Sequence, residues 1–238
     1  MLVIMTGTIR PKKNIVKLAE TDADTRRNQY IEAVLSVLKT PGVDKLVFCD
    51  NSGEILRDDR LTRAAEEYET QLEILEYEAD ADKVSSCGKG YGEGDAMKYV
   101  LEHSELVKDE QSFMKLTGRL KVRNLERVLK KLRPGENYFQ GMYLHNPEHL
   151  ADTRCYVVNT QVYRQELMTV HEQVRDREHY YLEHAFSDAI RTKKIPYRNM
   201  PVYPEICGIS GSSGKTYRLP IFKKVMKRVA GALNLMKV

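Results

Sequence analysis

The sequence predicts a single-domain α/β fold with a mainly parallel sheet flanked by helices. Short apolar runs alternate with amphipathic helical patterns, each run ends in a polar or glycine-containing turn, and 238 residues suffice for one large core. Strand, helix and strand in repetition are typical of right-handed crossovers, which bring the carboxyl ends of parallel strands to one edge. We therefore expect ligand-binding residues in the turns that follow the strands.

The first half of the chain supplies the repeating units. Apolar runs that predict strands occupy 2–5, 45–49, 72–77 and 112–119. Helices are expected between Asp24, a candidate N-cap, and Thr40, over about 57–69, and after a glycine-rich turn at 88–94. We expect four segments to face one crevice: 6–9, 50–53, 89–94 and 115–119.

The second half is less regular. It predicts a basic helix at about 124–132, a strand at 155–158, a helix after Thr160 and another around 180–190. These elements are expected to join the same sheet and form the second wall of the crevice. From Pro220 an apolar face opposes a basic one, which predicts an amphipathic helix over 220–238. That helix suits an anionic membrane surface or a docking site on the protein's own core.

Composition narrows the class of protein. The net charge is +4, and the four cysteines are scattered, which argues against a zinc cluster or a disulfide scaffold. The first residues lack the pattern of a signal peptide, and no apolar run approaches the length of a membrane span. The expected location is the cytoplasm, either free or peripheral on the cytoplasmic face of a membrane.

A basic pair, Lys115 and Arg119, marks the end of the fourth strand. Ammonium and guanidinium groups at that edge favour a diphosphate held by cations of the protein itself. The alternative is that both residues pair with carboxylates on the rim, where ion pairs are common and contribute little.

The turns, in this order, resemble those of small bacterial or viral capsule and surface-polysaccharide glycosyltransferases of the GT-A fold. The matching segments are Met5-Thr6-Gly7-Thr8-Ile9, Cys49-Asp50-Asn51-Ser52-Gly53, Gly88-Lys89-Gly90-Tyr91-Gly92-Glu93, Lys115-Leu116-Thr117-Gly118-Arg119 and Tyr181-Leu182-Glu183-His184. The resemblance spans most of the chain. It implies an enzyme that moves a sugar from a nucleotide-diphosphate-sugar to a hydroxyl of a surface or lipid-linked glycan.

The resemblance also implies a division of the chain. Residues 1–219 would form the catalytic domain, with the donor bound by 1–123 and the acceptor side formed by 124–219, followed by the helix at 220–238. The implied donor-binding residues are Thr6, Gly7, Thr8, Asp50, Asn51, Lys89, Gly90, Arg123 and Lys215. The alternative for the first turn is a simple tight turn, and for the glycine run a loosened loop. The small-residue loop with Lys215 is either a lid or a linker.

The usual Asp-x-Asp metal motif is missing from the end of the fourth strand. Asp80-Ala81-Asp82 has the right residues but lies one helix too early. By resemblance to metal-independent members of the fold, Lys115 and Arg119, assisted by Arg123, would replace the cation. No cofactor and no metal ligand are therefore expected.

Glu183 is the candidate general base, because an inverting transferase needs a carboxylate to remove the proton of the attacking hydroxyl. A retaining enzyme would not use it in this way. Asp152, Arg154 and His184 are candidates for the acceptor side, although a lone histidine on a helix is more often packed or capping.

Two other functions remain open from the sequence. A sugar nucleotidyltransferase of the same fold would use a basic first loop, here Arg10, Lys12 and Lys13, together with magnesium. A nucleic-acid-binding module would use the basic C-terminal segment, but that segment lacks interleaved aromatic residues and a recognisable motif. No specific nucleic-acid partner is therefore expected.

Overall fold

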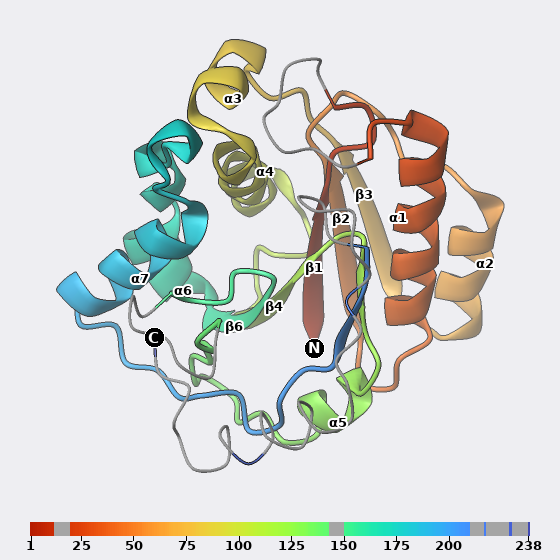
Figure 1. Ribbon diagram of the computed structural model, residues 1–238. Coiled ribbons are helices and arrows are strands. Elements are labelled where there is room, and N and C mark those ends of the chain that lie inside the picture. Colours follow the sequence, from red (N-terminus) through yellow and green to blue (C-terminus); the bar gives the residue numbers. More distant parts are fainter. Residues whose placement is uncertain (12–19, 143–149, 210–216, 218–228, 230–237) are drawn as a thin grey trace.

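Five strands form the central sheet, in the order β3-β2-β1-β4-β6 (Figure 1). The computed structural model describes residues 1–11, 20–142, 150–209, 217, 229 and 238. Strands β1 to β4 are parallel and β6 runs antiparallel to β4. Their bounds are Leu2–Gly7 for β1, Lys45–Asp50 for β2, Gln71–Glu76 for β3, Ser112–Thr117 for β4 and Cys155–Asn159 for β6. The predicted α/β fold with a mainly parallel sheet is confirmed.

Helices cover both faces of the sheet (Figure 1). Helices α1 (Ala23–Leu38) and α2 (Asp59–Glu67) lie on one face, and α4 (Lys89–His103) and α7 (Leu182–Thr192) lie on the other. Side chains of β1 alternate between the two layers: Val3 and Met5 belong to the core beneath α1, whereas Leu2 and Ile4 belong to the core beneath α4 and α7. Burial on both faces explains why this strand is an uninterrupted apolar run in the sequence.

Shorter elements complete the fold. They are α3 (Ala81–Cys87), β5 (Leu120–Val122), α5 (Leu125–Leu129), α6 (Thr160–Val162) and β7 (Ile206–Gly208). The predicted strand at 155–158 joins the main sheet as β6, but β7 pairs with β5 in a separate two-stranded sheet. The predicted helix after Thr160 is broken: α6 runs into a π-helical turn at Tyr163–Leu167 and a 3₁₀ turn at Val170–Gln173.

Two predicted helix starts were wrong. Asp22, not Asp24, caps α1, since its carboxylate accepts a hydrogen bond from the Thr25 amide at 2.7 Å. The glycine run at 88–94 is not a turn but the first turns of α4, and Gly88 alone has a positive φ, of 114°. A Cβ on Gly94 would lie 2.2 Å from Cβ of His171, so the glycines allow close helix packing.

The C-terminal segment is described only at Val229 and Val238. Val229 is exposed, whereas Val238 packs into the core beneath α4 and α7, and its carbonyl accepts a hydrogen bond from Tyr197 Oη at 3.0 Å. The predicted helix over 220–238 otherwise lies outside the described residues. Within the described residues, no helix is both long and apolar enough to cross a bilayer.

Candidate active site

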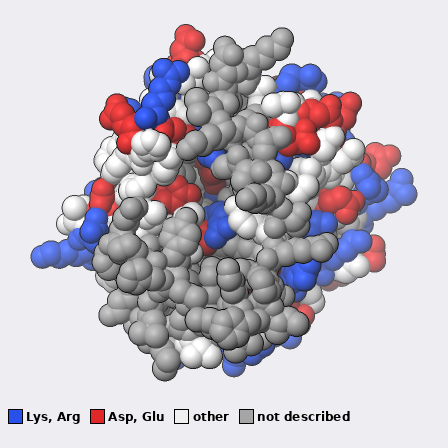
Figure 2. All heavy atoms as spheres, in the orientation of Figure 1, with Lys and Arg blue, Asp and Glu red and all other residues white. Residues whose placement is uncertain are grey.

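A cavity of about 270 Å³ opens at the carboxyl ends of β1 and β4. The chain crosses from β1 to β2 on one side and returns from β3 to β4 on the other, so the cavity occupies the switch point of the sheet. Figure 2 shows this region as a hollow in which acidic and basic side chains lie together. Each of the four segments predicted to face one crevice contributes residues to the lining of this cavity. Examples, one from each segment, are Thr6, Asn51, Glu93 and Arg119.

The turn after β2 holds the turn after β1. Asp50 is fully buried and accepts hydrogen bonds from the backbone amides of Ile9, at 2.6 Å, and Ser52, at 2.8 Å. Burial raises the pKa of Asp50, and these hydrogen bonds lower it in part. Asn51 accepts from Thr8 Oγ1 at 2.6 Å. Asn51 and Thr8 line the cavity, whereas Asp50, predicted to bind the donor, anchors the turn below it.

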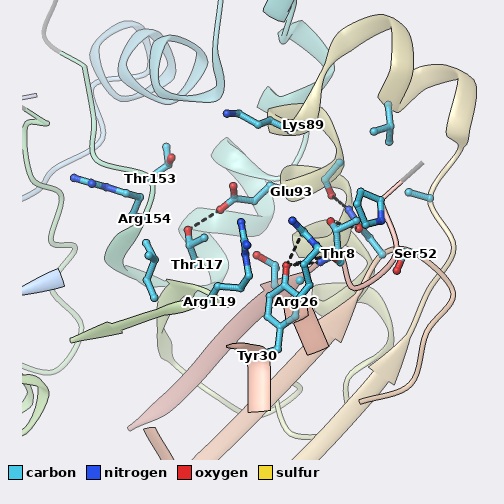
Figure 3. Close-up of a pocket in the computed structure, with 18 of the residues that line it drawn as sticks. Thr8, Arg26, Tyr30, Ser52, Lys89, Glu93, Thr117, Arg119, Thr153 and Arg154 are labelled. Atoms are coloured by element: carbon cyan, nitrogen blue, oxygen red, sulfur yellow. Dashed lines mark hydrogen bonds between the residues drawn. The ribbon is translucent and has the colours of Figure 1, made fainter. Parts of the chain in front are cut away.

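Two buried arginines form one wall of the cavity (Figure 3). Arg26 is 3% exposed, and its Nε donates to the carbonyl of Thr8 at 2.6 Å. Arg119 is 8% exposed, and its Nη1 donates to Gln29 Oε1 at 2.8 Å. Burial lowers the pKa of Arg119, and the charge of Arg26 acts in the same direction. Among the described residues, neither guanidinium forms an ion pair with a carboxylate.

Thr6 adds an unused polar group to this wall. Its Oγ1 is buried and has no hydrogen-bond partner among the described residues. Thr6 lies at the end of β1 and lines the cavity. Because an unpaired buried hydroxyl costs free energy, the wall formed by Arg26, Arg119 and Thr6, which we call the arginine wall, is suited to an anionic ligand with acceptor oxygens.

Lys115 lies beneath the cavity rather than in it. The side chain is 1% exposed, and its ammonium contacts the carboxylate of Glu93 and donates to Thr117 Oγ1 at 3.1 Å and to the carbonyl of Thr153 at 2.8 Å. The two residues of the basic pair are thus separated: Arg119 lines the cavity, and Lys115 bonds to residues that line it.

The opposite wall comes from the start of α7 and the segment before β6. Thr153 Oγ1 donates to Glu183 Oε1 at 3.3 Å, and both residues line the cavity. Arg154 also lines it and forms a bidentate pair with Asp152, with N···O distances of 2.7 and 2.6 Å. Asp152, predicted for the acceptor side, is buried below the surface of the cavity as the partner of Arg154.

Several predicted residues lie away from the cavity. His184 Nδ1 accepts from the Tyr181 amide at 3.1 Å and so caps α7. Gly90 packs against Leu182, and Arg123 is exposed beside β5. Lys215 lies outside the described residues.

The start of α4 is already capped by a carboxylate. Asp176 Oδ2 accepts a hydrogen bond from the amide of Lys89 at 3.1 Å, at the helix start that was expected to bind the donor. Lys89 lines the cavity, and its backbone amide is engaged with Asp176 at the start of the helix.

Arg26, Tyr30 and Glu93 are among the cavity residues that were not selected from the sequence. Arg26 and Tyr30 belong to α1, and Glu93 lies inside the glycine run. Arg26 and Tyr30 are four residues apart, which places both on one helix face. The spacing could have indicated that the two side chains lie together, but it does not show whether this face of α1 is directed towards the cavity.

No group of three or more His, Cys, Asp or Glu side chains in the described part of the chain has the arrangement of a metal site. Asp80 instead caps α3, accepting from the amides of Asp82, at 3.0 Å, and Lys83, at 3.1 Å. The Asp80 carboxylate of the Asp80-Ala81-Asp82 segment is therefore engaged at the start of a helix.

No protein-family model and no curated protein matches the chain. Among solved structures, the galactosyltransferase LgtC, in complex with donor and acceptor sugar analogs, superposes with a TM-score of 0.54 and 12% identity, over 85% of this chain and 74% of LgtC. The chain has the fold of a glycosyltransferase. The glycosyltransferase GlyE of Streptococcus pneumoniae TIGR4 gives a TM-score of 0.49 and 14% identity over 82% of this chain, which spans 44% of GlyE. The predicted GT-A-like fold is confirmed by the LgtC match.

Proposed function

We propose that the chain is a glycosyltransferase that moves a sugar from a nucleotide-diphosphate-sugar to a hydroxyl of a surface or lipid-linked glycan. The arginine wall carries the proposal: Arg26 and Arg119 are buried at the switch point without a carboxylate partner among the described residues. Support comes from the fold shared with LgtC, which binds donor and acceptor sugar analogs.

The departing diphosphate gains negative charge as the bond to the sugar breaks. Guanidinium groups in a partly dry cavity stabilise such charge more in the transition state than in the ground state. Each guanidinium can also donate two parallel hydrogen bonds to phosphate oxygens. In this proposal Arg119 and Arg26 contact the diphosphate, Thr6 Oγ1 donates to one of its oxygens, and Asn51 and Thr8 contact the nucleoside.

The acceptor lies on the wall formed by Glu183, Thr153 and Arg154. If the configuration at the sugar is inverted, the Glu183 carboxylate takes the proton of the attacking hydroxyl while the diphosphate leaves. Arg154 is held by Asp152 and orients the acceptor. Lys215 and Arg123 remain predictions for the diphosphate side.

Metal independence is part of the proposal. The two positive charges of the arginine wall take the place of a divalent cation beside the diphosphate. Transfer that continues in excess EDTA supports this role, and transfer that requires manganese or magnesium contradicts it.

Contact with a membrane is a separate proposal that rests on the basic face of residues 220–238. Flotation with anionic vesicles, compared with a chain lacking 220–238, tests it. Docking of Val238 in the core argues for the alternative, in which this segment packs on the protein itself.

The deciding experiment is thermal unfolding with a panel of nucleoside diphosphates and their sugars, each with metal and with EDTA. A ligand raises the melting temperature only if the folded state binds it, so one stabilising nucleotide identifies the donor class. Release of nucleoside diphosphate from the matching sugar nucleotide then measures transfer. Release of pyrophosphate from a nucleoside triphosphate would instead identify a nucleotidyltransferase, and no stabilisation and no release by any member would overturn the proposal.

A further inference from the structure

A buried lysine holds the carboxylate of Glu93 at the floor of the cavity. The Lys115 ammonium has three N–H donors and three acceptors: Glu93 Oε1, Thr117 Oγ1 and the carbonyl of Thr153. Thr117 Oγ1 also donates to Glu93 Oε1, at 3.1 Å. These contacts use all three N–H donors of Lys115, so none is left for a bound ligand. The side chain is also only 1% exposed, so a ligand in the cavity could hardly contact it.

Both contacts to Glu93 use the same oxygen. Oε1 receives Lys115 and Thr117, whereas no hydrogen bond from a described residue occupies Oε2. The Glu93 side chain is 27% exposed and lines the cavity. Figure 3 shows Glu93 beside Thr117, facing the space that Lys89 and Arg119 also border. The carboxylate is therefore fixed through one oxygen and presents the other to the cavity.

The same lysine connects the two carboxylates of the site. Lys115 donates to the carbonyl of Thr153, and the hydroxyl of Thr153 donates to Glu183. Glu93 and Glu183 are therefore attached to one hydrogen-bonded chain that starts at a rigid sheet strand. Such attachment limits the rotamers of both acids, as preorganised sites require.

We propose that Lys115 is a positioning residue that orients Glu93, and that Glu93 Oε2 faces the reacting sugar. The proposal rests on the transferase function above. As the diphosphate leaves with its bonding electron pair, positive charge develops on the sugar ring, and a fixed carboxylate oxygen stabilises that charge without forming a bond. In this assignment Lys115 does not contact the diphosphate, as the resemblance implied, but holds the carboxylate that faces the sugar.

The purely structural alternative is a buried ion pair that only stabilises the fold. Such a pair gives little net stability, because removing both charges from water offsets their attraction. An ion pair with the same residue types, Lys45 with Glu110 at 2.8 Å, lies at the start of β2 and away from the cavity. Lys45 is more exposed than Lys115, and its pair provides a control for the loss of a lysine–glutamate contact outside the cavity.

The test compares Lys115→Met, Glu93→Gln, the double variant and the control Lys45→Met. We expect Glu93→Gln and Lys115→Met each to lower kcat by about 100-fold or more, with the dissociation constant of the matching nucleoside diphosphate within about threefold of wild type. The double variant should be no slower than Glu93→Gln, since Lys115 acts through Glu93. Lys45→Met should keep wild-type kcat.

A Lys115→Met variant that binds the nucleoside diphosphate tenfold more weakly would overturn the proposal, because the lysine would then contact the diphosphate. So would normal turnover in Glu93→Gln.

Thermal unfolding without ligand separates this result from a failure of the proposed function. Lys115→Met should lower the melting temperature because Glu93 loses its partner, and the double variant should recover part of that loss. Losses that simply add would show that Lys115 does not hold Glu93, even if no donor in the panel is turned over.

Discussion

Replacing Arg119 with methionine should weaken ligand binding without unfolding the protein. Arg119 is buried, lies near a second guanidinium and has no carboxylate partner among the described residues. The hydrogen bond from this charged group to Gln29 contributes about 1.5–3 kcal/mol, and removing the buried, unpaired charge returns a free energy of similar size. The free energy of unfolding should therefore change by about 1 kcal/mol or less.

The loss on the ligand side should be larger. A hydrogen bond between a guanidinium and an ionised oxygen contributes about 1.5–3 kcal/mol, and each 1.4 kcal/mol changes the dissociation constant about tenfold. The nucleoside diphosphate should therefore bind about 10- to 100-fold more weakly to Arg119→Met. Titration calorimetry measures this change, and urea unfolding measures stability.

Arg60→Met is a suitable control, because Arg60 is an exposed arginine paired with Asp58 at 2.9 Å. It should leave nucleotide affinity unchanged. If Arg119→Met loses about 3 kcal/mol or more of stability and still binds the nucleotide normally, Arg119 is a structural residue and the arginine wall is not the diphosphate site.

Further predictions concern packing, charge and pH. Gly94→Ala should lose about 1–3 kcal/mol of unfolding free energy, measured in urea, because the new Cβ would overlap His171. Asp152→Ala should lose about 3 kcal/mol by the same measurement, since the guanidinium of Arg154 would lose its bidentate partner; a loss no larger than that of a surface ion pair would contradict this. Burial lowers the pKa of Lys115 to about 7. As the pH rises, the Lys115 ammonium therefore loses its proton at a lower pH in the folded protein than in the unfolded chain. Stability relative to Lys115→Met should therefore rise between pH 7 and pH 10, and a flat difference would refute it.

Local patterns were sufficient to predict the sheet. The run Leu2–Met5 is apolar because both faces of β1 are covered, and the polar turn that follows it marks the edge where ligands bind. The pairing of β5 with β7 could not be predicted, because each has three residues and the two lie far apart in the chain. Two such short segments have no periodicity of their own.

The position of the site in the fold could be predicted from the sequence, but only some of its residues could. Topology alone brings Thr6, Asn51, Lys89 and Arg119 to one edge. It does not say that α1 turns Arg26 towards that edge. The resemblance placed the glycine run around Glu93 in the donor-binding site, whereas in the structure its glycines allow α4 to pack closely on its neighbours. Both features depend on tertiary packing.

Because β6 is antiparallel to β4, the two walls of the cavity can diverge in sequence separately. Because β6 enters the sheet from the cavity side, Thr153 and Arg154 reach the cavity from a part of the sequence that is separate from the turns after β1 and β2. One wall is thus encoded before residue 120 and the other after residue 150. Exchanging 150–192 between related chains would replace the second wall as a block, so natural variation or laboratory chimeras can change one wall of the cavity while the other is kept.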